Sequence, residues 1–158
     1  MGQFGRSISY LDSLIIAAKR TKKTEALPTI IRLAEKLTPE SHFSHFRAVS
    51  IALETIGDPK GAEPLFKILE MPGVRGHVMP DIKTAKKLSP AHKNDVSTRN
   101  NSLRELILGR ALYKCGDFNG VGNQILNDYF KDLRGHYYRH ASGVLQLFSG
   151  EKEVEVEL

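Results

Sequence analysis

The sequence predicts an all-α fold, an α-solenoid of about seven antiparallel helices with one long insertion. Its main support is a motif that occurs twice: residues 51–61 align without a gap with residues 110–120, 59 positions further on. The second support is that apolar residues recur three and four positions apart in several segments, as amphipathic helices require. Self-similarity at such a spacing is typical of helical repeat proteins.

The repeated motif contains the residues that end one helix and begin the next. Gly57 and Gly116 are expected just past a helix end, where glycine adopts the left-handed conformation without steric cost. Asp58 and Asp117 follow and are expected to accept hydrogen bonds from the free amides of the next helix. Pro59 fits the first position of that helix, where no amide donor is needed.

Four helices share one apolar stripe, and each of the first three is followed by a partner helix. The partner helices are expected at residues 24–37, 60–70 and 119–133. Two stripes have one polar member each, Thr21 and Glu105. The four stripes are Leu11, Leu14, Ala17, Ala18 and Thr21; Phe46, Val49, Ala52, Leu53 and Ile56; Glu105, Leu108, Ala111, Leu112 and Cys115; and Tyr138, Ala141, Val144, Leu145 and Phe148.

Residues 1–150 are expected to form a single helical-repeat domain, and residues 151–158 an acidic tail. The second and third repeat units are farther apart in the sequence than the other units, which places an insertion at residues 71–98. This insertion is rich in proline and glycine, with a helical turn or two expected at residues 83–88. Long insertions in small domains are often functional, so we expect a contact arm whose removal leaves the fold nearly intact.

Composition and charge restrict the class of protein. The chain has 158 residues, 41% of them apolar, and a net charge of +5. Its single cysteine, Cys115, excludes an internal disulfide framework. There is no run of about 18 apolar residues, so no membrane partner is expected. The start of the chain lacks the apolar run of a signal peptide, which predicts a cytoplasmic protein if the chain is complete and leaves the compartment undetermined if it is a fragment.

Basic residues concentrate in the insertion and give the candidate binding residues. Residues 71–99 contain six Lys and Arg residues and two Asp residues, which gives a net charge of +4. Such a segment could bind an acidic protein surface, a phosphate or a cofactor edge; the alternative is a solvated loop. A second candidate surface is the exposed face near Arg134 to His140, at the start of the last helix. The candidate binding residues are Arg75, His77, Lys83, Lys86, Lys87, Lys93, Arg99, His136, Arg139 and His140.

No catalytic or metal-binding residue is nominated. The pairs His42/His45 and His136/His140 could each share a helical face, but surface or helix-end histidines explain them better than a metal site. Cys115 occupies a core position of its stripe, which favours a buried apolar role over a nucleophile. The carboxylates are scattered, so no acid–base pair is proposed.

The run from Phe46 to Pro59 resembles the HEAT-like repeat first noted in phycobilisome lyases. In that family an Arg opens the first helix, an Ala-Leu pair lies near its end and Gly-Asp-Pro forms the turn. Arg47 and Arg139 match the Arg position, whereas Asp12 and Leu106 do not. The resemblance implies a HEAT-like α-α superhelix, a fold that serves many functions. HEAT-like deoxyhypusine hydroxylases use His-Glu dipeptides, which this sequence lacks.

The chain also looks like the helical C-terminal region of certain bacterial FAD-dependent oxidoreductases. That likeness implies an accessory module whose FAD is held by another part of a parent protein. This chain has no Gly-x-Gly-x-x-Gly motif, so no cofactor is expected in it.

Three functions follow from these observations. The first is a non-catalytic HEAT-like scaffold for protein–protein or interdomain contacts, as a fragment or accessory C-terminal module of a larger protein. The second is the substrate-side module of a FAD-dependent oxidoreductase. The third is a nucleic-acid-binding HEAT-like domain, although HEAT-like DNA glycosylases use a tryptophan and this chain has none. Enzyme status therefore depends on the parent protein.

Overall fold

The computed structural model describes Ser13, Ile15, Ala17, residues 24–88 and residues 95–154. Over these residues the chain is helical with no strand, which confirms the all-α class. Most of the first predicted helix lies outside the described residues, and Lys93 lies outside them as well. The elements are η2 Thr24–Ala26, α2 Leu27–Ala34, α3 Phe43–Ile56, η3 Pro59–Gly61, α4 Ala62–Leu69, α5 Ile82–Leu88, α6 Ser97–Lys114, α7 Val121–Tyr129 and α8 Gly135–Val154.

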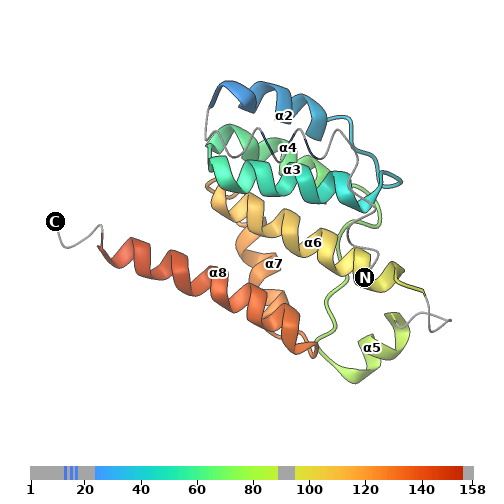
Figure 1. Ribbon diagram of the computed structural model, residues 1–158. Helices are drawn as coiled ribbons and strands as arrows, with labels where there is room; N and C mark the ends of the chain where they lie inside the picture. The colour runs from blue at the N-terminus through green and yellow to red at the C-terminus, as the bar shows by residue number, and fades with distance from the viewer. Residues whose placement is uncertain (1–12, 14, 16, 18–23, 89–94, 155–158) are drawn as a thin grey trace.

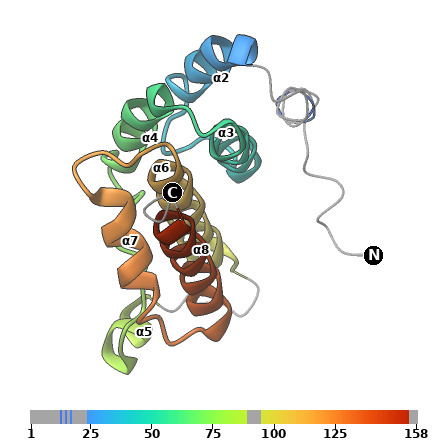
Figure 2. The ribbon, with the colours of Figure 1, turned by 90° about the vertical axis from the view of Figure 1, so that its left-hand side faces the viewer.

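Helix α6 lies at the centre of the molecule (Figure 1). It contacts α3 and α4 on one side and α7 and α8 on the other. Figure 2 shows the same arrangement from the side, with α2, α3 and α4 at one end of the molecule and α5 at the opposite end. The start of α6 and the start of α8 both point toward α5 (Figure 1), so three helix ends meet in one region.

The predicted stripes of α3 and α6 form the core. Phe46 and Leu53 of α3 and Leu108 and Leu112 of α6 are fully buried. Glu105, the polar member of the α6 stripe, is also buried, with 5% of its surface exposed. The stripes therefore locate the core correctly, and the polar residue is inside it rather than outside.

Three details of the predicted stripes and helix bounds are wrong. In α8 Tyr137 is buried whereas Tyr138 is 41% exposed, a shift of one position. Helix α7 ends at Tyr129, earlier than predicted, so Phe130 and Leu133 lie beyond it and are exposed. In the first predicted stripe Ala17 is exposed, while its neighbour Ile15 is buried.

The two copies of the turn share a capping role but differ in backbone path. Gly57 is left-handed at φ 66°, and the Asp58 carboxylate accepts from the amide of Lys60 at 2.9 Å. In the second copy Asp117 itself has a φ of 63°. Its carboxylate accepts from the amides of Gly122 and Asn123 at 2.8 and 2.9 Å, at the start of α7. The aspartate therefore caps the following helix in both copies, as predicted, by two different routes.

Helices α6 and α7 approach each other backbone to backbone at two glycines. A Cβ added to Gly122 would lie 2.7 Å from the backbone nitrogen of Tyr113 and 3.0 Å from the carbonyl oxygen of Gly109. A Cβ added to Gly109 would lie 2.7 Å from Cγ2 of Ile125. Because backbone atoms cannot move aside as a flexible side chain can, this crossing requires glycine at position 122.

We predict that Gly122→Ala destabilises the fold by about 2–3 kcal/mol, since the new methyl group overlaps backbone atoms of α6. Gly143→Ala is the matched control, because Gly143 also lies within a helix and its added Cβ meets nothing within 4 Å. There the better helix propensity of alanine should stabilise the protein by up to about 1 kcal/mol. Urea unfolding of both variants measures the difference, and equal effects would contradict the close crossing.

Candidate functional site

The site begins with a buried carboxylate in the middle of the molecule. Glu105 of α6 accepts a hydrogen bond from the amide of Gly76 at 2.9 Å on Oε1 and from the amide of His77 at 2.8 Å on Oε2. The hydroxyl of Tyr129 donates to Oε2 at 2.9 Å. Burial raises the pKa of Tyr129, and the charge of Glu105 raises it further. The carboxylate therefore holds the segment of residues 73–79, which we call the strap, against α6 and α7.

Arg104, the residue before Glu105, fixes the first residue of the strap. Its Nη2 donates to the carbonyl oxygen of Gly73 at 2.7 Å, and its Nη1 to that of Pro39 at 3.0 Å. The guanidinium also lies over the Phe46 ring, 5.2 Å from the centroid. Burial lowers the pKa of Arg104. Two adjacent residues of α6, of opposite charge, thus bind the same stretch of backbone.

Asp132 and Arg134 fix the other end of the strap. The amide of Met79 donates to Oδ2 of Asp132 at 2.9 Å, and the amide of Leu133 donates to the carbonyl oxygen of Met79 at 2.9 Å. Burial alone would raise the pKa of Asp132, but hydrogen bonds from Arg134 and from the amides of Met79 and Arg134 outweigh it and lower the pKa. The end of the strap is therefore bonded to the turn between α7 and α8.

The side chain of Arg134 is held on several sides. It forms two hydrogen bonds with Asp132, from Nε at 2.8 Å and from Nη2 at 2.7 Å. Its other donors reach the carbonyl oxygen of His77 and the hydroxyl of Ser102, both at 3.0 Å. The guanidinium lies 4.2 Å from the ring centroid of Tyr137. Arg134 is consequently a rigid, charge-compensated group, with 21% of its side chain exposed.

The structure corrects the expectation that the whole insertion is a removable arm. Val74 is fully buried and Met79 is 6% exposed, so the strap contributes to the core and to its edge. Its removal would leave the carboxylate of Glu105 without its two backbone donors and would take the amide of Met79 from Asp132. Among the described residues of the insertion, α5 faces outward: its Ile82 is 69% exposed.

We predict that Glu105→Ala costs about 3–5 kcal/mol of unfolding free energy, because two backbone amides and one phenol lose their acceptor inside the protein. Glu63→Ala is the control, since Glu63 forms an exposed pair with Lys67 at 2.7 Å. Loss of an exposed pair should cost less than about 0.5 kcal/mol. Chemical denaturation of both variants decides the question, and a small cost for Glu105→Ala would show that the strap is loosely held.

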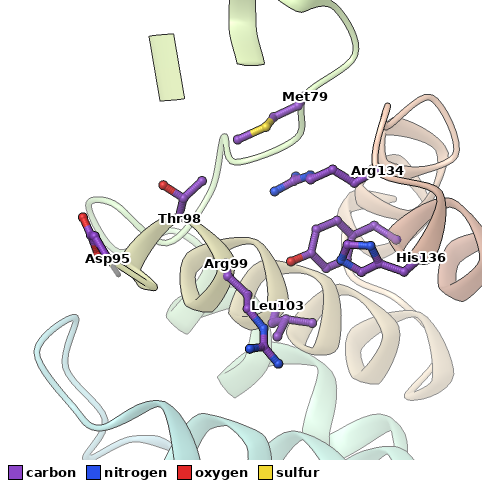
Figure 3. Close-up of a pocket in the computed structure, with 8 residues that line it drawn as sticks. Met79, Asp95, Thr98, Arg99, Leu103, Arg134 and His136 are labelled. Atoms are coloured by element: carbon purple, nitrogen blue, oxygen red, sulfur yellow. The ribbon is translucent and has the colours of Figure 1, made fainter. Parts of the chain in front are cut away.

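A hollow of about 520 Å³ opens between the end of the strap, the start of α6 and the start of α8. Figure 3 shows side chains from all three segments directed toward it. Its lining combines apolar groups with charged ones. The lining residues are Met79, Asp95, Thr98, Arg99, Leu103, Arg134, His136 and Tyr137.

Helix α5 borders the hollow. The hydroxyl of Thr98, a lining residue, donates to the carbonyl oxygen of Leu88 at the end of α5, at 2.9 Å. Met79, another lining residue, precedes α5 by three positions. The helix contains no acidic residue, and its three lysines are exposed at positions 83, 86 and 87. The hollow therefore has a basic helix along one edge.

The structure brings five of the ten sequence-predicted binding residues to this region. Arg99 and His136 line the hollow, and Lys83, Lys86 and Lys87 lie on the helix that borders it. Arg75 pairs instead with Glu70 at 2.7 Å. The ring of His77 contacts the carbonyl oxygen of Gly73 at 3.0 Å, within the strap.

Of the remaining predicted residues, two lie elsewhere and Lys93 is outside the described part of the chain; several lining residues were not predicted. Arg139 and His140 are on exposed parts of α8, and His140 bonds to Arg110. Sequence reasoning did not nominate Met79, Leu103 or Tyr137 as binding residues, and it named Arg134 only as the start of the second candidate surface. Glu105 was the available signal, because a carboxylate within an apolar stripe must find partners inside the protein.

A second polar cluster joins α3, α6 and α8. Arg110 donates through Nη2 to Oε1 of Glu54 at 2.7 Å and through Nη1 to Nδ1 of His140 at 3.0 Å. A guanidinium only donates, so Nδ1 of His140 is the acceptor and the imidazole is neutral. Although His140 is exposed, the partial desolvation of its ring lowers its pKa, and the charges of Arg110 and His136 lower it further.

We predict that His140 makes the protein less stable in mild acid. Below about pH 6.5 the unfolded chain binds a proton at this imidazole that the folded chain does not, so the unfolding free energy falls as the pH falls. His140→Asn keeps an acceptor for Arg110 and removes the titration. Denaturation at about pH 7 and pH 5 should show a smaller loss for the variant; parallel losses would exclude this role for His140.

The other singled-out side chains have structural roles. The ring of His42 caps α3 by accepting from the amide of Ser44 at 3.3 Å. Cys115 is 1% exposed, and burial, followed by the charges of Asp58 and Glu54, raises its pKa to about 12. This confirms a core position for Cys115. Among the described residues no group of three His, Cys, Asp or Glu side chains is placed to hold a metal ion.

No helix in the described part of the chain is both long and apolar enough to cross a membrane. No family model, curated protein or solved structure matches the chain. Its function must therefore be inferred from the hollow and the charges around it.

Proposed function

We propose that this chain is a non-catalytic helical scaffold of the HEAT-like type that binds a protein or a neighbouring domain. The contact surface is the exposed face of α5 together with the hollow at the starts of α6 and α8. Capping aspartates after Gly57 and Gly116 and the buried stripes of α3 and α6 support the helical-repeat arrangement. The observation that carries the function is the hollow of about 520 Å³ beside a basic helix.

The hollow has the features of a pocket for an anchor side chain. Binding pockets of about 300–1,000 Å³ combine apolar walls with a few fixed polar groups. Here Met79 and Leu103 supply apolar surface. Hydrogen bonds to Asp132, Ser102 and His77 fix the guanidinium of Arg134 before any partner binds. A preformed pocket loses little side-chain entropy on binding, which favours affinity.

The residues that line the hollow are poorly suited to catalysis. Two lining residues carry hydroxyls: that of Thr98 already donates its proton to the carbonyl oxygen of Leu88, and burial raises the pKa of the Tyr137 phenol. The thiol of Cys115 is buried elsewhere, with its pKa raised to about 12. Arg134 and Asp132 compensate each other within the fold. A binding role therefore fits these groups better than a reaction.

Nucleic acid is the second candidate partner, because α5 is basic and the isoelectric point of the chain is near 9.4. Single-stranded nucleic acids are bound through exposed aromatic rings on which bases stack. Phe118, Phe130 and Tyr138 are exposed but do not line the hollow, and Tyr137 is 1% exposed. The hollow suits an apolar side chain better than a base. If the chain belongs to a FAD-dependent oxidoreductase, the neighbouring domain of that parent would occupy the same surface.

A photo-crosslinking residue at position 99 tests the proposal. In the native cells we expect one discrete protein adduct from position 99 and none from position 124, an exposed site on α7. The purified partner should bind at least tenfold more weakly to the triple variant Lys83→Glu, Lys86→Glu, Lys87→Glu, because acidic side chains repel an acidic partner. Adducts removed by nuclease would favour nucleic acid, and the absence of adducts at position 99 would refute the surface.

A further inference from the structure

We propose that the hollow and α5 bind the acidic segment of residues 151–158 from a second copy of this chain, so that copies associate head to tail. The inference rests on the binding role proposed above for this surface and names its occupant. It is carried by charge complementarity and by the length and direction of α8.

The segment combines negative charge with regularly spaced apolar side chains. Its eight residues contain four glutamates and one lysine, a net charge of −3. Apolar residues alternate with glutamate at Val154, Val156 and Leu158. The segment therefore combines the negative charge and the apolar side chains that a basic surface with an apolar hollow can bind.

Helix α5, at the border of the hollow, has the opposite charge, and the hollow offers apolar surface. Helix α5 exposes three lysines and contains no acidic residue. Met79 and Leu103 place apolar atoms in the hollow, and the hydrogen bond from Thr98 to Leu88 joins the hollow to the end of α5. A basic helix therefore adjoins apolar surface, as acidic and apolar residues adjoin each other in the sequence of the segment.

The direction of α8 decides whether the segment comes from the same chain. His136, at the start of α8, lines the hollow, and the helix continues for 20 residues to Val154. At about 1.5 Å per residue it carries the chain about 30 Å away. Figure 1 shows α8 leading out of the helical body. The four following residues reach at most about 14 Å, so the segment of one copy cannot return to its own hollow.

Contact between the hollow of one copy and the segment of another is heterologous, because the two partners use different surfaces. Each copy then has one free hollow and one free segment, and association can continue. The attraction depends on exposed charges, so it should weaken as salt screens them.

A charge-reversal pair tests this inference. The hollow-reversed variant carries Lys83→Glu, Lys86→Glu and Lys87→Glu; the tail-reversed variant carries Glu151→Lys, Glu153→Lys, Glu155→Lys and Glu157→Lys. For the wild-type chain we expect a mass, measured by light scattering, that rises with concentration at about 50 mM salt and falls to the monomer at about 1 M. Each variant alone should associate at least tenfold more weakly.

An equimolar mixture of the two variants is the decisive sample. The mixture restores opposite charges at both kinds of contact, because the acidic segment of one variant meets the basic hollow of the other and the reversed segment meets the reversed hollow. It should therefore associate where neither variant does alone. Circular dichroism confirms that both variants are folded. A monomeric wild-type chain, a monomeric mixture, or variants that associate like the wild type would each overturn the inference. The crosslink from position 99 to another protein would survive that result, so the two proposals fail separately.

Discussion

The buried carboxylate of Glu105 is the constraint on which the rest of this structure depends. A carboxylate inside a protein is stable only when hydrogen bonds replace the water it has lost. Glu105 obtains them from two consecutive backbone amides and one phenol, and the backbone amides belong to a segment without regular structure. The central helix thereby holds the strap, and Arg104 beside it holds the first residue of the same strap.

This constraint leads directly to the candidate site. Once the strap is fixed, Met79 is fixed at its end, and Asp132 and Arg134 bond to it from the turn before α8. The hollow lies where these groups meet the start of α6. Its shape therefore derives from the core of the protein, while α5, with its lysines, extends from the end of the strap. A rigid pocket beside an exposed basic helix is the combination that we connect with partner binding.

The sequence predicts the helices well because apolar spacing and Gly-Asp turns are local signals. The stripe of α3, the aspartate caps and the buried position of Cys115 were all predictable. The strap was not, because its order comes from hydrogen bonds to residues 28 and 29 positions away in the chain. The hydrogen bonds of Arg134 were not predicted for the same reason: its partners His77 and Ser102 are distant in sequence. The one-residue shift in α8 arises where Tyr137, and not Tyr138, packs against Tyr129 at 5.9 Å between ring centroids.

Amide hydrogen exchange at the strap, followed by NMR, tests the central claim most directly. The amides of Gly76, His77 and Met79 donate to the buried carboxylates of Glu105 and Asp132. They should therefore exchange only when the core opens, at rates close to that of Leu112 in the interior of α6. Exchange of these three amides at the rate of an exposed, unstructured peptide would contradict the account.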